Sequence, residues 1–138
     1  MFLTRTTIEW GDCDEAGIIF YPNYFYIFDT SYQRFLRSAG LSQRKLREKY
    51  SAITPLVEAG AQFRAPISYD DEVSIEMTLA DIAEKRFRIA YRILRGETLA
   101  AEGFEQRAFA VREPSGKLRG APIDPAFRAL LEDKLAKA

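Results

Sequence analysis

The stretch PNYFYIFDTSYQRFLRSAG, residues 22–40, decides the fold. Its apolar side chains recur at the three- and four-residue spacing of one helical face, and they are Phe25, Phe28, Tyr32, Phe35, Leu36 and Ala39. Pro22 suits the first position of a helix, and Gly40 suits its C-terminal stop. A helix over 22–39 would be about 27 Å long at 1.5 Å per residue. Its wide aromatic face predicts that a sheet wraps around it.

Strands are indicated on both sides of this helix. Some segments are rich in β-branched residues, and others alternate strictly between apolar and polar residues, which is typical of half-buried strands. The predicted strands cover residues 4–10, 53–65, 73–79, 87–93 and 98–112.

Two further helices complete the predicted order of elements. One covers 42–49 with Ser42 as its cap, and the other covers 125–136 with Asp124 as its cap. The chain therefore fits the α+β class, with one curled antiparallel β-sheet wrapped around one long central helix in a single domain, 1–138. Its Phe, Tyr and Leu residues are too many for one sheet face, so we expect an oligomer to cover the outer face.

The composition excludes several classes of function. Lys plus Arg and Asp plus Glu number 20 each, so no nucleic-acid or membrane surface is expected. No apolar run approaches the ~20 residues of a membrane span, and the N-terminus lacks the apolar core of a signal peptide. Cys13 is the single cysteine, so an intrachain disulfide is impossible and a cytoplasmic location is expected.

The chain contains no histidine. This excludes Ser-His-Asp and Cys-His hydrolases, and it excludes the common zinc sites, so we expect no metal. Cys13 lies between two aspartates that would raise its pKa, and no imidazole is present to activate its thiol. We therefore interpret Cys13 as a small buried side chain and not as a nucleophile.

The segment before the long helix, WGDCDEAGIIFYPNY (10–24), carries the candidate chemistry. Asp12 and Asp14 lie two residues apart, close to a helix N-terminus whose unpaired N–H groups can stabilise an anion or a developing oxyanion. Gly17 would let a ligand approach the backbone closely. Asp and Gly before a helix also form ordinary turns and caps, and the pattern alone leaves that alternative open.

This segment resembles the signature of the 4-hydroxybenzoyl-CoA thioesterase family, an aromatic residue followed by G/E-D-x-D-x-x-G-I/V-V-aromatic-Y/H-x-x-Y. The matching positions are Asp12, Asp14, Gly17, Ile18, Tyr21, Pro22, Asn23 and Tyr24. The stretch FRAPISYDDEV (63–73) resembles the second stretch of the family, F-x-x-P-x-x-x-x-D. A tyrosine at Tyr21, where another branch keeps a histidine, is similar to the aromatic-acyl branch. The resemblance implies the hotdog fold.

The resemblance also implies roles for individual residues. Asp14 matches the catalytic carboxylate, which attacks the thioester carbon or activates a water. Tyr21 matches the residue whose backbone N–H polarises the thioester carbonyl. Phe20 and Tyr24 flank the acyl pocket, and Asp12 is expected to be a structural partner of the loop. The family places its sites at a dimer interface, and its dimers commonly pair into tetramers.

Cations are needed for the phosphates of coenzyme A. Lys85 and Arg86 align with a family stretch of the type basic-Lys-Ser-Phe, with Arg86 in place of the serine and Glu84 in place of the basic residue. Lys117 and Arg119 are further candidates. Each of these cations could instead be an ordinary solvated surface charge.

The resemblance predicts a thioesterase that cleaves an aromatic acyl-CoA such as 4-hydroxybenzoyl-CoA or benzoyl-CoA. Coenzyme A would enter as part of the substrate, and no separate cofactor is expected. Two alternatives stay open: a thioesterase for aliphatic or polyketide-type acyl thioesters, and a non-catalytic module that binds acyl-CoA.

Overall fold

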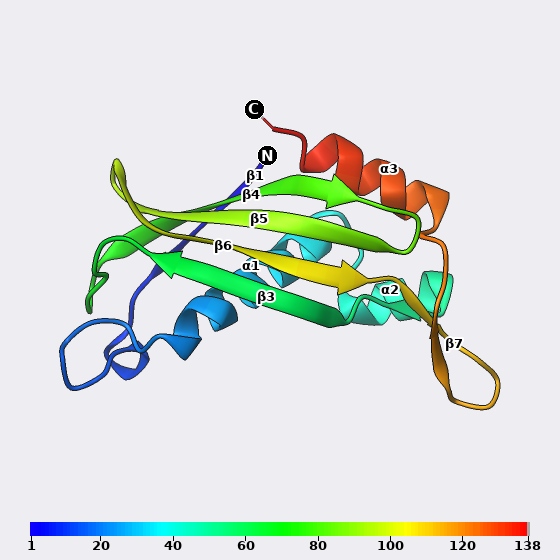
Figure 1. Cartoon of the computed structure of the whole chain (residues 1–138), viewed down its shortest axis with the longest axis horizontal. Coiled ribbons are helices and arrows are strands. Elements are labelled where there is room, and N and C mark those ends of the chain that lie inside the picture. Colours follow the sequence, from blue (N-terminus) through cyan, green and yellow to red (C-terminus); the bar gives the residue numbers. More distant parts are fainter. Residues whose placement is uncertain (138) are drawn as a thin grey trace.

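The computed structural model describes residues 1–137, so Ala138, at the end of the predicted domain, lies outside the described residues. The order of elements confirms the predicted one (Figure 1). The elements are β1 (Phe2–Thr7), a 3₁₀ turn (Trp10–Asp12), α1 (Pro22–Ser38), α2 (Gln43–Tyr50), β2 (Ala52–Ile53), β3 (Leu56–Phe63), β4 (Glu72–Ile82), β5 (Arg86–Arg95), β6 (Thr98–Ala108), β7 (Ala110–Arg112), β8 (Leu118–Gly120) and α3 (Pro125–Lys134).

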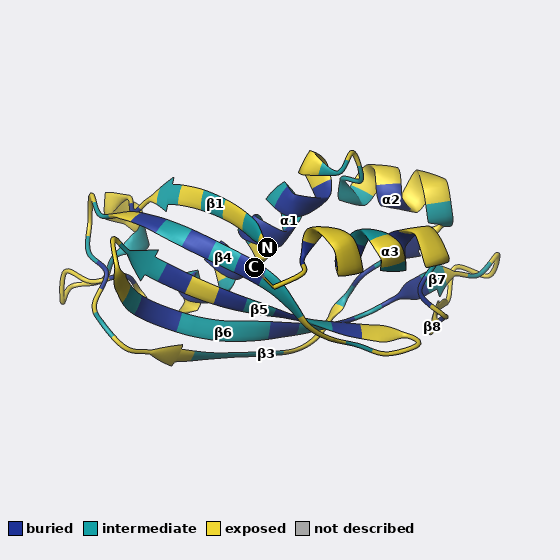
Figure 2. Ribbon diagram, turned by 90° about the horizontal axis from the view of Figure 1, so that it is seen from above, coloured by how far each residue is buried: buried dark blue, intermediate teal, exposed yellow. Residues whose placement is uncertain are grey.

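The main sheet is antiparallel, has five strands in the order β1-β4-β5-β6-β3, and curls around α1 (Figures 1 and 2). This confirms the predicted α+β class with one central helix. β1 and β3 are the two edge strands. None of the helices formed by residues 1–137 combines the length and the apolar character needed to cross a membrane.

Aromatic packing holds α1 against the sheet. Phe28, Tyr32, Phe35 and Leu36 are buried, as the helical stripe predicts, whereas Phe25 and Ala39 are only half-buried. The Phe28 ring stacks on Tyr91 with centroids 4.6 Å apart. Gly103 makes this contact possible, because a Cβ there would lie 2.6 Å from the Phe28 ring. The helix therefore sits deep in the curl of the sheet.

Three predicted strands were wrong in their bounds. The strand predicted over 53–65 is divided at Thr54 and Pro55 into β2 and β3, which belong to different sheets. The strand predicted over 4–10 ends at Thr7, because the Glu9 N–H donates to Asp12 Oδ2 at 2.8 Å and starts the 3₁₀ turn. The segment predicted as one strand over 98–112 breaks at the buried Phe109. Beyond the break, β7 joins β2 and β8 in a small three-stranded sheet that the sequence did not predict.

The expected reason for an oligomer was also wrong. The outer face of the sheet, turned away from α1, is charged and carries the cross-strand ion pairs Arg64–Glu102, Arg88–Glu58 and Arg92–Glu76. Several exposed apolar side chains lie on edge strand β3, where Leu56, Val57 and Phe63 are each about half exposed. The β3 edge is therefore one of the surfaces on which a second chain can make apolar contacts, beside others such as Trp10 and Tyr26.

Candidate active site

The loop between β1 and α1 is held by backbone hydrogen bonds. The Asp14 N–H donates to the Ile18 carbonyl at 2.9 Å, and the Gly17 N–H donates to the Asp14 carbonyl at 3.0 Å. Gly17 has a φ of +82°, a conformation that favours glycine. The Ile19 N–H donates to the carbonyl of Ile67 at 2.8 Å, which ties the loop to the segment before β4. The loop is therefore fixed at both ends.

Asp14 is exposed at the tip of this loop. Its Oδ1 accepts a hydrogen bond from the Ala16 N–H at 2.9 Å. Its Oδ2 accepts no hydrogen bond from residues 1–137. One oxygen thus orients the carboxylate, and the other is open to a water or to an electrophilic carbon.

The start of α1 offers a hydrogen-bond donor. Pro22 carries no N–H, and the N–H groups of Asn23 and Tyr24 donate to the carbonyls of Phe20 and Tyr21 at 2.9 and 3.2 Å. Within the described chain, no acceptor pairs with the Tyr21 N–H. The positive end of the helix dipole lies at the same place. This arrangement can stabilise negative charge that develops on a carbonyl oxygen.

Asp12 and Asn23 join the loop to the helix. The carbonyl of Asp12 accepts hydrogen bonds from the Phe20 N–H and from Asn23 Nδ2, both at 2.8 Å. The side chain of Asp12 is engaged by the Glu9 N–H. These contacts hold the loop together, and the structural role expected of Asp12 stays a prediction. The motif includes Asn23, but only the structure shows that its amide holds the loop.

Aromatic rings surround the loop. Tyr24 is buried, and its ring centroid lies 4.7 Å from that of Phe63 on β3. Phe20 is 47% exposed and contacts Tyr21 edge to face at 5.4 Å. In the sequence, Phe63 is only the first residue of the stretch 63–73 that resembles the second family motif. Its contact with Tyr24 is seen only in the structure, which brings β3 against the start of α1. Phe20 and Phe63 are each about half exposed, so these rings form an aromatic surface beside the start of α1.

The thiol of Cys13 does not match a nucleophile. Cys13 is half-buried, and its Sγ lies 3.7 Å from the Glu9 carbonyl. Burial raises the pKa of this thiol, and the neighbouring charges of Asp12 and Asp14 raise it further. A thiol that stays protonated is a poor nucleophile.

The candidate phosphate ligands lie far from Asp14 in the same chain. Lys85 and Arg86 are at the turn between β4 and β5, at the opposite end of the sheet from the loop (Figure 1). The 11 residues of β4 separate the two ends by about 35 Å at ~3.3 Å per residue. The β7–β8 hairpin, with Lys117 and Arg119, lies at that far end too, and Arg119 pairs with Glu113 at 3.2 Å.

No group of three or more side chains with the donor types of a metal site occurs in residues 1–137. Asp14, the Tyr21 N–H and the aromatic rings all lie in or next to the segment that joins β1 to α1, and Lys85 and Arg86 lie at the other end of the sheet.

Comparisons with known proteins give a consistent result. The family model described as the thioesterase-like superfamily matches residues 8–131. The 4-hydroxybenzoyl-CoA thioesterase of Pseudomonas sp. (strain CBS-3) is 32% identical over 113 residues, covering 77% of this chain and 80% of that one. The 1,4-dihydroxy-2-naphthoyl-CoA hydrolase of Synechococcus elongatus is 28% identical over 90 residues, covering 64% of this chain and 66% of that one.

Solved structures agree with these sequence matches. The gentisyl-coenzyme A thioesterase BH1999 superposes with a TM-score of 0.81 at 31% identity, covering 92% of this chain and 99% of that one. A second solved structure is an aspartate-to-asparagine mutant of 4-hydroxybenzoyl-CoA thioesterase, complexed with 4-hydroxybenzoyl-CoA. It superposes with a TM-score of 0.84 at 28% identity, covering 94% of this chain and 97% of that one.

Proposed function

The chain belongs to the thioesterase-like superfamily as a hotdog-fold acyl-CoA thioester hydrolase, and from this premise we propose that it hydrolyses an aromatic acyl-CoA such as 4-hydroxybenzoyl-CoA or benzoyl-CoA. One observation carries the proposal: the loop before α1 holds an open carboxylate oxygen on Asp14, and the same segment ends with an unpaired N–H on Tyr21 at the start of α1. Coenzyme A is part of the substrate, and we assign no separate cofactor. The single thiol, Cys13, favours the cytoplasm.

The chemistry needs two groups on opposite sides of one carbonyl. The thioester oxygen would accept a hydrogen bond from the Tyr21 N–H, which stabilises the negative charge of the tetrahedral intermediate. Asp14 either attacks the carbonyl carbon, forming an anhydride that water then cleaves, or takes a proton from an attacking water. In both routes the C–S bond breaks and the thiolate of coenzyme A leaves. Gly17 keeps the backbone beside Asp14 accessible, because a Cβ at Gly17 would meet no atom within 4 Å.

The aromatic acyl group is supported by the walls of the site and by the relatives. Phe20, Tyr24 and Phe63 present ring faces and edges, which favour an aromatic ligand. The three relatives described above are named for hydroxybenzoyl, gentisyl and dihydroxynaphthoyl groups. An aliphatic or polyketide-type acyl group would fill the same space without the ring contacts.

A panel of acyl-CoA substrates tests this preference. Comparing kcat/KM for acetyl-, hexanoyl-, benzoyl- and 4-hydroxybenzoyl-CoA, we expect the two aromatic substrates to exceed hexanoyl-CoA by ~10-fold or more, since one or two ring contacts contribute ~0.5–1.5 kcal/mol each. A thiol reagent reports the free coenzyme A. Equal rates for hexanoyl- and benzoyl-CoA would favour the aliphatic alternative, and no free thiol with any substrate would favour a binding module.

Because Lys85 and Arg86 lie far from Asp14 in one chain, we propose that two chains form a homodimer through β3. Two such dimers pair into a tetramer. A two-fold axis pairs β3 antiparallel with its copy, so the Leu56 end of one strand meets the Phe63 end of the other. The β4–β5 turn lies at the Leu56 end, and the catalytic loop lies at the Phe63 end. Dimerisation would therefore bring Lys85 and Arg86 of one subunit to the end of the sheet where Asp14 of the other lies.

Charge reversal of Lys85 or Arg86 tests this assignment. In Lys85→Glu and Arg86→Glu, we expect KM for benzoyl-CoA to rise several-fold while kcat changes little, because phosphate contacts far from the reacting bond bind ground and transition states alike. Arg5→Glu, an exposed charge on the opposite edge strand, is the matched control and should keep the wild-type KM. A benzoyl-pantetheine substrate should show no difference among the variants. An unchanged KM for benzoyl-CoA in both variants would place the phosphates elsewhere.

A further inference from the structure

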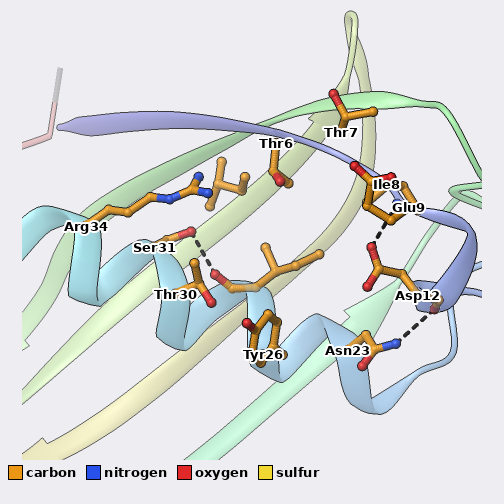
Figure 3. A pocket seen from close by; sticks show the side chains of 12 residues that line it. Thr6, Thr7, Ile8, Glu9, Asp12, Asn23, Tyr26, Thr30, Ser31 and Arg34 are labelled. Carbon is orange, nitrogen blue, oxygen red and sulfur yellow. Dashed lines mark hydrogen bonds between the residues drawn. The ribbon is translucent and has the colours of Figure 1, made fainter.

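A cavity lies between α1 and edge strand β1 (Figure 3). Its volume is about 510 Å³. Its lining residues come from β1, the 3₁₀ turn, α1 and β4, and they are Thr6, Thr7, Ile8, Glu9, Asp12, Asn23, Tyr26, Ile27, Thr30, Ser31, Arg34 and Ile75. The proposed thioester site uses Asp14 and the Tyr21 N–H, and neither residue lines this groove.

The groove has an apolar floor and a hydroxyl-bearing rim. Ile8, Ile27 and Ile75 are buried and form the floor. Thr6 on β1 and Thr30 on α1 face the groove, where a helix packed on a sheet would ordinarily present apolar side chains (Figure 3). Within residues 1–137, neither hydroxyl has a hydrogen-bond partner. A ligand with an apolar body and polar groups at its ends would complement this lining.

Arg34 is the only cation of the lining, and it has no counter-ion. Its Nη1 donates to Thr4 Oγ1 at 3.0 Å and to the Arg5 carbonyl at 2.9 Å, both neutral acceptors. No Asp or Glu of residues 1–137 pairs with it, and its Nε and Nη2 donate to no acceptor there. The more deeply buried Arg107, by contrast, has two carboxylate partners. A half-buried guanidinium with free N–H groups is suited to a planar carboxylate.

The acidic side chains of the groove lie at its opposite end. Glu9 and Asp12 are beside Asn23, and Asn23 and Arg34 are separated by about 16 Å along the helix at 1.5 Å per residue. An anion is therefore favoured at the Arg34 end and disfavoured at the Asp12 end. This polarity fixes how a ligand with one negative charge would lie.

We propose that this groove is a second binding site, separate from the thioester site, for a small organic carboxylate. Its carboxylate accepts hydrogen bonds from Arg34, its apolar body lies on the isoleucine floor, and Thr6 and Thr30 bind any hydroxyl it carries. Thioester hydrolysis releases an acid of this chemical class, and only that link to the product rests on the proposed function. The binding itself depends on the groove alone.

Calorimetric titration of the full chain with benzoate tests the proposal without measuring activity. We expect one benzoate per chain, with Kd raised at least ~10-fold in Arg34→Gln, since a charge-assisted hydrogen bond contributes ~1.5–3 kcal/mol. Arg37→Gln, an exposed arginine one turn further along α1, is the matched control and should bind as wild type. Asp14→Asn should also bind as wild type, which separates this site from the thioester site. Benzyl alcohol, of similar shape but uncharged, should bind at least ~10-fold more weakly than benzoate.

A second variant keeps the test valid if Arg34→Gln fails to fold, since Arg34 ties α1 to β1. Thr30→Val preserves the shape of the side chain and both hydrogen bonds of Arg34, and it should weaken the binding of 4-hydroxybenzoate. Arg34→Lys keeps the positive charge and should retain part of the affinity for benzoate. Equal benzoate affinity in wild type and Arg34→Gln, equal 4-hydroxybenzoate affinity in wild type and Thr30→Val, or loss of benzoate binding in Asp14→Asn would overturn the proposal. So would inorganic phosphate binding as tightly as benzoate, or no benzoate binding at millimolar concentration. The substrate panel fails or succeeds independently of these titrations.

Discussion

Replacing Asp14 with asparagine is expected to lower kcat by at least ~10²-fold, the low end of what a positioned acid or base contributes. Asparagine has the size of aspartate, and its Oδ1 can still accept the hydrogen bond from the Ala16 N–H, so the loop should keep its shape. The amide is neither a useful base nor a useful nucleophile, and both routes to hydrolysis lose their acting group. The loss falls on the transition state, so KM should change little.

Steady-state rates of benzoyl-CoA hydrolysis, followed with a thiol reagent, measure this loss. Asp12→Ala is the informative control. Asp12 Oδ2 accepts from the Glu9 N–H and alanine has no oxygen to replace it, so that change should lower stability and activity together by weakening the turn. Cys13→Ala should retain most of the activity, because the thiol is held protonated. Asp14→Asn with more than about a tenth of wild-type kcat would mean that another group supplies or activates the nucleophile.

The sequence predicts the parts of the fold that local patterns encode. The helix predicted over 22–39 is observed at Pro22–Ser38, because Pro22 and Gly40 mark its ends and its stripe meets the sheet. The caps predicted at Ser42 and Asp124 are confirmed by hydrogen bonds to the Lys45 and Ala126 N–H groups. The early end of β1 depends on one side chain bonding to a nearby N–H, and β propensity alone does not contain that information.

The candidate site also has one part that local sequence patterns encode and another part that depends on the whole fold. Asp14 and Tyr21 are close in sequence, and the structure places Asp14 in the loop before α1 and Tyr21 at the start of that helix. The positions of Lys85 and Arg86 relative to the loop depend on the end of the sheet at which the β4–β5 turn lies. That is a property of the whole sheet topology. Motif similarity identifies those cations but does not show that they lie far from Asp14 in the same chain.

A buried charge network under α1 was missed at the sequence level. Glu105 and Arg107 lie on β6, where the segment 98–112 is irregular and a charged pair suggests a solvated edge. The signal lies in their spacing. Because successive side chains of a strand point to opposite faces, Glu105 and Arg107 share a face with Ala101 and Gly103, and Gly103 packs against Phe28. Tyr91 completes the network, since its hydroxyl donates to Glu105 Oε1 at 2.6 Å.

Arg107 is the centre of this network. Its side chain is 5% exposed, and its Nη2 lies 3.0 Å from Glu105 Oε1 and 2.9 Å from Asp29 Oδ1. Its Nη1 donates to the Thr54 carbonyl at 2.9 Å, and its guanidinium lies 4.1 Å from the centre of the Tyr32 ring. Asp29 and Tyr32 belong to α1, so Arg107 fixes this helix against β6.

Replacing Arg107 with methionine is therefore expected to lower the free energy of unfolding by ~3–5 kcal/mol, because it leaves the Glu105 carboxylate buried without its partner. Urea unfolding measures the loss. Arg88→Met is the matched control, since Arg88 pairs with Glu58 on the exposed face and should cost less than ~1 kcal/mol. The double variant Arg107→Met/Glu105→Gln should recover much of the loss, since removing both charges leaves no unpaired buried ion.

The pH dependence of the Arg107→Met deficit gives a second, independent measurement. Burial already raises the pKa of Glu105 even with Arg107 present, and removing the cation should raise that pKa further. A carboxyl whose pKa is higher in the folded state than in the unfolded state contributes its full stability below the unfolded value of ~4.3, and that stability is lost as the pH rises through the folded value. The variant should therefore lie closer to wild type at pH 5 than at pH 8. A deficit below ~1 kcal/mol, or one that grows on acidification, would show that Glu105 does not depend on Arg107.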